Sequence, residues 1–298
     1  MSTLFDPIHI LAFDHRQVLR DMLGTPDESE AAAYERLSDG KQLVAEAAAE
    51  LAASGAAGVG LLIDEEYGAD AARFAADNGV TLAMPVEASR TKIIEYQYGD
   101  DYPQHVTAFG PDIVKLLVFH NPGDDAERQR IQFERTLEVS RWCKQNDYAL
   151  MLEILLPATP EQLDSVDGSN ERFVDELQTE LLRESIKQYQ DAGIEPDLWK
   201  VVGLPSAADF KVVAGQARAD GRDHVGCIVL GNGAGVTQVE TWLATAAGVE
   251  GFTGFAVGRS IWFEPLKAYY FDGLSRDEAR ARIVNSFSTL IRAFSSGR

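Results

Sequence analysis

Eight short apolar runs, regularly spaced and each closed by a turn signal, constrain the fold more than any other feature of this sequence. Within a run, apolar and polar side chains do not alternate, and continuous apolar runs are typical of parallel strands that are covered on both faces. The runs are residues 8–14, 58–64, 80–86, 112–119, 149–156, 197–203, 224–230 and 252–258. The sequence therefore predicts a parallel sheet of buried strands.

Helical patterns lie between most of these runs. Residues 29–55, 125–146 and 171–193 carry apolar residues at helical spacing with polar faces between them. Strand and helix thus alternate without a break in composition, which predicts an α/β protein with a single (β/α)8 barrel as the one domain of residues 1–298. A doubly wound open sheet is the alternative. Residues 85–111 fit the pattern least well, because a long connection there precedes only a short helix.

The balance of charge limits the kinds of partner. The chain carries 47 acidic and 27 basic residues, a net charge of −20, and such a surface repels nucleic acid and anionic lipid. No signal peptide or membrane-spanning stretch is evident, and Cys143 and Cys227 lack metal-ligand spacing. A cytoplasmic protein that binds neither nucleic acid nor membranes is expected, and association into a homo-oligomer is left open.

Polar residues at the carboxyl ends of the strands are the candidates for a functional site, because (β/α)8 barrels carry their catalytic groups there. These candidates are Asp14, His15, Arg16, Asp64, Glu87, His120 and Arg259. His9 and His224 lie where strands begin and are interpreted as structural.

Three charged residues lie inside neighbouring runs, namely Lys115, Glu153 and Lys200. If all three point inward, the carboxylate lies between two ammonium groups in a medium of low dielectric constant. A buried lysine beside a second cation has a lowered pKa and becomes a neutral amine that attacks carbonyl groups. Lys200 is therefore predicted to be a Schiff-base nucleophile, with Glu153 moving protons. The alternative is a buried ion pair with a purely structural role.

Glycines follow the last two runs, where such barrels commonly bind phosphate with backbone N–H groups and a helix N-terminus. Gly231, Gly233 and Gly258 are therefore predicted to bind a phosphate, with Arg259 adding a fork of donors. The candidates for binding the other end of the substrate are Arg90, Lys92 and His120.

Metal-dependent aldol cleavage is another chemistry that barrels support. His15 and His120 are both expected at the active face, but the sequence supplies no third histidine there, and a catalytic zinc site needs three protein ligands. The sequence also lacks a Walker loop, a GxSxG elbow and a complete dinucleotide fingerprint. Neither a metal nor another cofactor is predicted.

Six segments resemble, in order, a known family of class I aldolases. They are LAFDHR (11–16), VKLLVFHNPGDD (114–125), LEILLPAT (152–159), DAGIEPDLWKVVGL (191–204), GRDHVGCIVLGNGA (221–234) and GFAVGRSIWFEPL (254–266). They look like the aldolase-type domain fused behind the sugar kinase of bacterial myo-inositol catabolism (5-dehydro-2-deoxygluconokinase). That domain is in turn similar to tagatose 1,6-bisphosphate aldolase and sulfofructose phosphate aldolase.

The resemblance covers nearly the whole chain and implies a class I aldolase barrel that forms dihydroxyacetone phosphate. It implies that Lys200 is the Schiff-base lysine and that Lys115, Glu153 and Asp14 are the other catalytic residues, with Asp14 binding hydroxyls or assisting cleavage of the C–C bond. The family usually has a glutamate two residues after the Schiff-base lysine, where this chain has Val202.

The substrate that the resemblance implies is 2-deoxy-5-keto-gluconate 6-phosphate, cleaved to dihydroxyacetone phosphate and malonate semialdehyde. Sulfofructose phosphate and tagatose or fructose bisphosphate are the alternatives. In the loop after the seventh run, Asn232 stands where the relatives commonly have a basic residue. A phosphosugar-binding domain without activity is the alternative of another class, because a fold does not by itself guarantee turnover.

Overall fold

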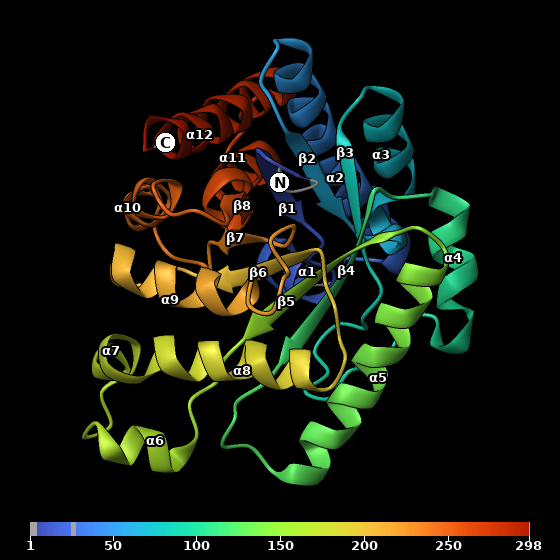
Figure 1. Ribbon diagram of the computed structural model, residues 1–298. Helices are drawn as coiled ribbons and strands as arrows, with labels where there is room; N and C mark the ends of the chain where they lie inside the picture. The colour runs from blue at the N-terminus through green and yellow to red at the C-terminus, as the bar shows by residue number, and fades with distance from the viewer. Residues whose placement is uncertain (1–4, 25–27, 298) are drawn as a thin grey trace.

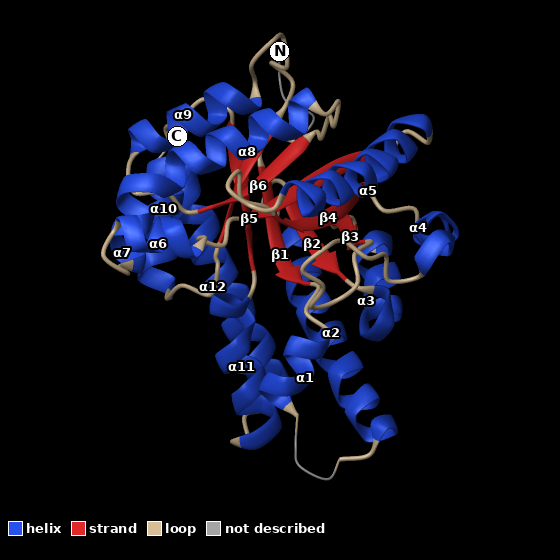
Figure 2. Ribbon diagram, turned by 90° about the horizontal axis from the view of Figure 1, so that it is seen from below, coloured by secondary structure: helices blue, strands red, loops and turns tan. Residues whose placement is uncertain are grey.

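The computed structural model describes residues 5–24 and 28–297, and its centre is a closed barrel of eight parallel strands. The strands follow one another around the barrel in chain order, and β1 (Ile8–Phe13) pairs with β8 (Phe252–Val257) to close it. Helices surround the strands in both views (Figures 1 and 2). The predicted (β/α)8 barrel is confirmed, and the open-sheet alternative is wrong because the closing pair leaves no sheet edge.

Each strand lies within a run predicted from the sequence. The remaining strands are β2 (Val59–Ile63), β3 (Thr81–Pro85), β4 (Ile113–Phe119), β5 (Ala149–Leu155), β6 (Leu198–Val202) and β7 (Gly226–Leu230). Nearly all of their residues are buried, because one face of each strand packs into the barrel and the other lies under the helices. The runs are apolar throughout for this reason.

The helices form the outer layer. They are α1 (Gln17–Leu23), α2 (Glu30–Ala53), α3 (Glu65–Asp77), α4 (Tyr102–Phe109), α5 (Ala126–Gln145), α6 (Pro160–Ser165), α7 (Asn170–Phe173), α8 (Thr179–Asp191), α9 (Ala207–Ala217), α10 (Val236–Ala247), α11 (Arg259–Phe271) and α12 (Arg276–Ser296), with the short helices η1 (Gly99–Asp101) and η2 (Val174–Gln178). The three helical patterns predicted from the sequence correspond to α2, to α5 and to α7–α8. None of the described helices is both long and apolar enough to cross a membrane.

The long connection after β3 is ordered against the barrel before it reaches α4. Its backbone forms an antiparallel bridge between Glu87 and Tyr96, and the Gln132 side chain of α5 accepts a hydrogen bond from the Ile94 N–H at 2.7 Å. The first part of the connection, from Glu87 to Thr91, lines the cavity at the carboxyl ends of the strands.

Candidate active site

A cavity of about 340 Å³ opens among the carboxyl ends of the strands. Lys115 of β4, Glu153 of β5 and Lys200 of β6 line its deep part, as predicted from the sequence. The register of the barrel explains why they converge, because Glu153 is directly opposite Lys200 and Leu117 is directly opposite Glu153. Lys115 is two residues before Leu117, so its side chain points to the same face of the sheet.

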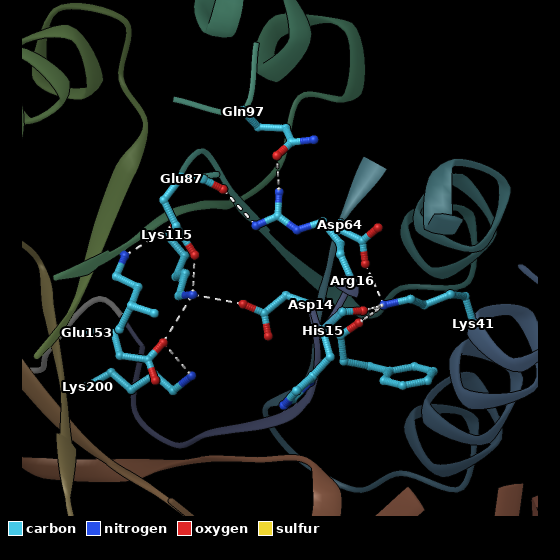
Figure 3. A network of polar contacts seen from close by, with 12 residues as sticks. Asp14, His15, Arg16, Lys41, Asp64, Glu87, Gln97, Lys115, Glu153 and Lys200 are labelled. Atoms are coloured by element: carbon cyan, nitrogen blue, oxygen red, sulfur yellow. Dashed lines mark hydrogen bonds and ion pairs between the residues drawn. The ribbon is translucent and has the colours of Figure 1, made fainter. Parts of the chain in front are cut away.

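The charged groups in the cavity form one network (Figure 3). The Lys115 Nζ atom lies 2.8 Å from Asp14 Oδ2, 2.5 Å from Glu87 Oε1 and 3.1 Å from Glu153 Oε2. The Lys200 Nζ atom donates to the same Glu153 oxygen at 2.9 Å. Glu153 therefore lies between two ammonium groups, as the sequence predicted, while Asp14 and Glu87 add two more carboxylates on the side of Lys115.

These extra carboxylates determine the direction in which the pKa of Lys115 is shifted. Burial alone lowers the pKa of this lysine, but Asp14, Glu87 and Glu153 together raise it well above its ordinary value. Three carboxylates thus outweigh burial, and Lys115 is held in its ammonium form.

The two inner carboxylates are held in their charged form. Burial raises the pKa of Asp14, but Lys115 and Lys200 lower it further, and the net pKa lies far below the ordinary value. The pKa of Glu153 is likewise raised by burial and lowered more strongly by Lys200 and Lys115. Asp14 and Glu153 are therefore ionised carboxylates at neutral pH.

His15 and Arg16 follow Asp14 into the cavity wall but have different surroundings. The His15 ring packs edge-on against Trp262, its Nδ1 is buried without a hydrogen-bond partner among the described residues, and burial lowers its pKa to about 4. The Arg16 guanidinium donates to the backbone oxygen of Glu87 at 2.6 Å and to Gln97 Oε1 at 3.0 Å. His15 is thus a neutral polar group on the cavity, whereas Arg16 holds the connection after β3 in place.

The two glycine loops meet at one end of the cavity, as predicted. Gly231, Gly233, Gly258 and Arg259 all line it, and Arg259 is the first residue of α11. Gly233 has φ +72°, and a Cβ atom there would lie 2.5 Å from the Arg259 guanidinium, so this position requires glycine. Arg259 forms no ion pair with a residue in the described ranges, and its guanidinium is exposed.

Three predicted positions lie away from the cavity. His120 is buried between α5 and α8, with Nε2 3.0 Å from Gln188 Oε1, because the inward positions of β4 are Leu117 and Phe119 and the next side chain points outward. The expectation that His120 binds substrate is therefore wrong. Lys92 is exposed and does not line the cavity.

Asp64 is the third of these positions. It caps α3 by accepting a hydrogen bond from the Tyr67 N–H at 2.9 Å and forms a buried ion pair with Lys41 at 2.5 Å. Arg90 does line the cavity rim, where it is paired with Asp21 of α1. Asp64 therefore serves the framework around the site, while Arg90 remains at its edge.

Lys41 was not predicted from the sequence. It lies in α2 and its side chain is fully buried, between the buried positions Leu37 and Val44 of the same helix. A lysine in the buried stripe of a helix is a signal that helical periodicity reveals. Within residues 5–24 and 28–297, no group of three or more histidine, cysteine, aspartate or glutamate side chains is arranged to hold a metal ion.

Known structures with this architecture include an aldolase. The chain is similar to fructose-bisphosphate aldolase from Plasmodium falciparum, in a complex with TRAP and a small-molecule inhibitor, with a TM-score of 0.64 and 14% identity over 96% of this chain and 89% of that one. It is also similar to Cgl0159 from Corynebacterium glutamicum (Brevibacterium flavum), with a TM-score of 0.60 and 18% identity over 97% of this chain and 86% of that one. The class of fold is therefore a (β/α)8 barrel.

The chain belongs to the DUF2090 family, described as an uncharacterized protein conserved in bacteria, which matches residues 2–298. No curated protein matches it. At identities below one fifth, the likeness to the two solved structures shows the fold alone.

Proposed function

We propose that this chain is a class I aldolase that cleaves a phosphorylated keto sugar or keto sugar acid into dihydroxyacetone phosphate and an aldehyde. The observation that carries the proposal is the unequal surroundings of the two buried lysines. Lys115 contacts three carboxylates, whereas Lys200, within the described residues, forms an ion pair with Glu153 alone, which it shares with Lys115. Lys115 is therefore the fixed cation of the pair, and we assign Lys200, which has one carboxylate contact in place of three, as the nucleophile.

Glu153 is placed to move the protons of Schiff-base formation. It accepts one ammonium proton from Lys200 across the 2.9 Å contact, and the resulting amine adds to the substrate carbonyl. A proton of the added nitrogen passes to the former carbonyl oxygen, and Glu153 returns its own proton to this hydroxyl group, which leaves as water. The product is an iminium cation, and the total charge of the lysine and substrate is unchanged.

Asp14 is the base of the carbon–carbon cleavage in this proposal. Its carboxylate takes the proton of the hydroxyl group on the carbon that leaves, the electrons of the broken bond enter the iminium, and the aldehyde departs from an enamine. Asp14 then gives the proton to the enamine carbon, and water hydrolyses the iminium to release dihydroxyacetone phosphate. Lys115, 2.8 Å from Asp14, keeps this carboxylate charged and oriented before each turnover.

The glycine loops and Arg259 are proposed to hold the phosphate. The α11 N-terminus begins at the cavity, and an exposed guanidinium without an ion pair in the described part of the chain is available to an anion. This arrangement puts the phosphate beside β7 and β8 and the carbonyl carbon near Lys200. The rest of the substrate then extends toward His15 and Arg90 on the other side of the cavity.

The substrate that we favour is 2-deoxy-5-keto-gluconate 6-phosphate, on the resemblance to the aldolase-type domain of inositol catabolism. Sulfofructose phosphate and the hexose bisphosphates differ from it mainly at the end that faces Arg90. A binding domain without turnover would not need the buried contacts that join Lys200, Glu153 and Lys115. Burying charged groups costs free energy, and buried clusters of charge are typical of functional sites.

Borohydride reduction in the presence of dihydroxyacetone phosphate tests the proposed chemistry. We expect a reduced adduct in the intact mass of the chain, and peptide mapping should locate it at Lys200. A chain that binds dihydroxyacetone phosphate but gives no adduct would contradict the Schiff-base mechanism and favour a binding domain.

Replacing Arg259 is expected to weaken phosphate binding. Arg259→Ala removes charge-assisted hydrogen bonds to the phosphate, so the Kd for dihydroxyacetone phosphate should rise by about 10- to 100-fold. Isothermal titration calorimetry measures this change, and Arg282→Ala, an exposed position of α12, serves as the matched control. If both variants bind as the wild type does, the phosphate lies elsewhere.

A further inference from the structure

Lys41 is a buried cation outside the network that carries the proposed chemistry. Its Nζ atom donates to the backbone oxygen of Phe13, to that of His15 at 2.8 Å and to Asp64 Oδ1 at 2.5 Å. An ammonium group has three N–H donors, so each of them has an acceptor. The Nζ atom also lies 4.2 Å from the centre of the Phe13 ring. The Lys41 ammonium group is therefore held in place by three acceptors and by the Phe13 ring.

Two of these acceptors are the carbonyl groups on either side of Asp14. The strand β1 ends at Phe13, where its register with β2 ends at Ile63, so the backbone that carries Asp14 lies beyond the last strand pair. Lys41 reaches this backbone from α2, as Figure 3 shows, and binds the carbonyl oxygens of both residues next to Asp14. It does so at the place where pairing with the neighbouring strand no longer holds the chain.

The Asp14 side chain is held separately, by Lys115 at 2.8 Å. The two lysines thus act on different parts of one residue, because Lys41 fixes the backbone and Lys115 fixes the carboxylate. Asp64 supplies the charge that balances Lys41, and its other oxygen caps α3. This pair connects α2, β2 and α3 to the end of β1.

We propose that Lys41 is a positioning residue for Asp14, an inference that rests on the proposed function. Without the Lys41 ammonium group, two buried carbonyl groups lose a donor, and the backbone at Asp14 is free to move. A shift of about 1 Å at a reacting group costs about a hundredfold in rate. Formation of the iminium does not use Asp14 in the proposed mechanism, so Lys41 acts on the proton transfers and not on the attack by Lys200.

Dihydroxyacetone phosphate alone separates these two steps. Borohydride trapping measures the iminium at Lys200, and exchange of a hydroxymethyl proton with deuterated water, followed by NMR, measures proton transfer between carbon and Asp14. In Lys41→Met we expect the yield of adduct to stay within about 3-fold of the wild type and the exchange to slow by about 100-fold. Lys41→Gln, which keeps two N–H donors without the charge, should slow it by about 10-fold, and it carries the test if the methionine variant does not fold.

Asp64→Asn is the matched control, because it disrupts the same buried ion pair and leaves the Lys41 contacts with the two carbonyl groups. It should exchange the proton within about 3-fold of the wild-type rate. The inference is overturned if the Lys41 variants exchange as fast as the wild type, or if Asp64→Asn slows exchange as much as they do. It is also overturned if adduct and exchange fall together. Absence of any adduct in the wild type would instead overturn the proposed function and this inference with it.

Discussion

Lys200→Met is expected to abolish the reduced adduct with dihydroxyacetone phosphate and to lower the rate of aldol cleavage by at least about 10³-fold. Methionine has nearly the length of lysine but no nucleophilic nitrogen, so the cavity keeps its shape while the iminium cannot form. Intact mass after borohydride treatment measures the adduct, and release of dihydroxyacetone phosphate from the favoured substrate measures the rate.

The same exchange at Lys211 provides the control for this prediction. Lys211 is an exposed residue of α9, so Lys211→Met should form the adduct and turn over as the wild type does. Lys200→Met should still bind dihydroxyacetone phosphate, because the glycine loops and Arg259 are unchanged. An adduct that persists in Lys200→Met and maps to Lys115 would show that the nucleophile has been misassigned.

The barrel could be predicted from the sequence because each of its strands is buried on both faces. That burial requires a continuous apolar run, and the runs 58–64 and 197–203 enclose β2 and β6 with one residue to spare at each end. The connection 85–111 was harder to interpret, since its order comes from contacts with α5 and not from a periodic pattern of its own.

The alternation of side chains along a strand made the centre of the site predictable, and it also explains the wrong prediction for His120. Successive side chains of a strand point to opposite faces, so a charged residue inside a barrel strand faces either the cavity or the helices. Lys115 and Lys200 face the cavity. His120 lies one residue beyond the inward-facing Phe119, so it faces the helices. The closeness of His120 to the end of β4 did not reveal which face of the sheet its side chain points to.

Contacts between distant segments could not be predicted. Lys41 binds the end of β1 only because α2 packs with its buried stripe against β1 and β2, and no pattern in the sequence fixes how far a side chain reaches across two elements. The position of Glu87 after β3 was predicted, but its ion pair with Lys115 depends on the course of the connection that follows. That pair is one of the three contacts that raise the pKa of Lys115.

Lys115→Met is expected to destabilise the fold more than any other single change in the network. It leaves Asp14, Glu87 and Glu153 close together, with Lys200 as the remaining cation in ion-pair contact with them among the described residues, and breaking a buried ion pair costs about 3–5 kcal/mol of the free energy of unfolding. Urea denaturation at pH 8 measures this loss. Lys200→Met is the matched control and should lose less, because Lys115 still neutralises the carboxylates that it contacts.

The dependence of this loss on pH distinguishes electrostatic repulsion from a packing defect. In the wild type, the pKa of Asp14 lies below its unfolded value of 3.8 and that of Glu153 below 4.5, so their stabilisation is present above about pH 5 and is lost at lower pH. In Lys115→Met, burial of Asp14 is no longer offset by its main cation, so its pKa rises above 3.8 and folding takes up a proton in mildly acidic solution. The difference in stability between the wild type and the variant should therefore shrink as the pH falls from 8 to 5, and the loss caused by the lowered pKa of His15 is common to both proteins and cancels in this comparison. A deficit that is the same at both pH values would mean that Lys115 contributes through packing and not through its charge.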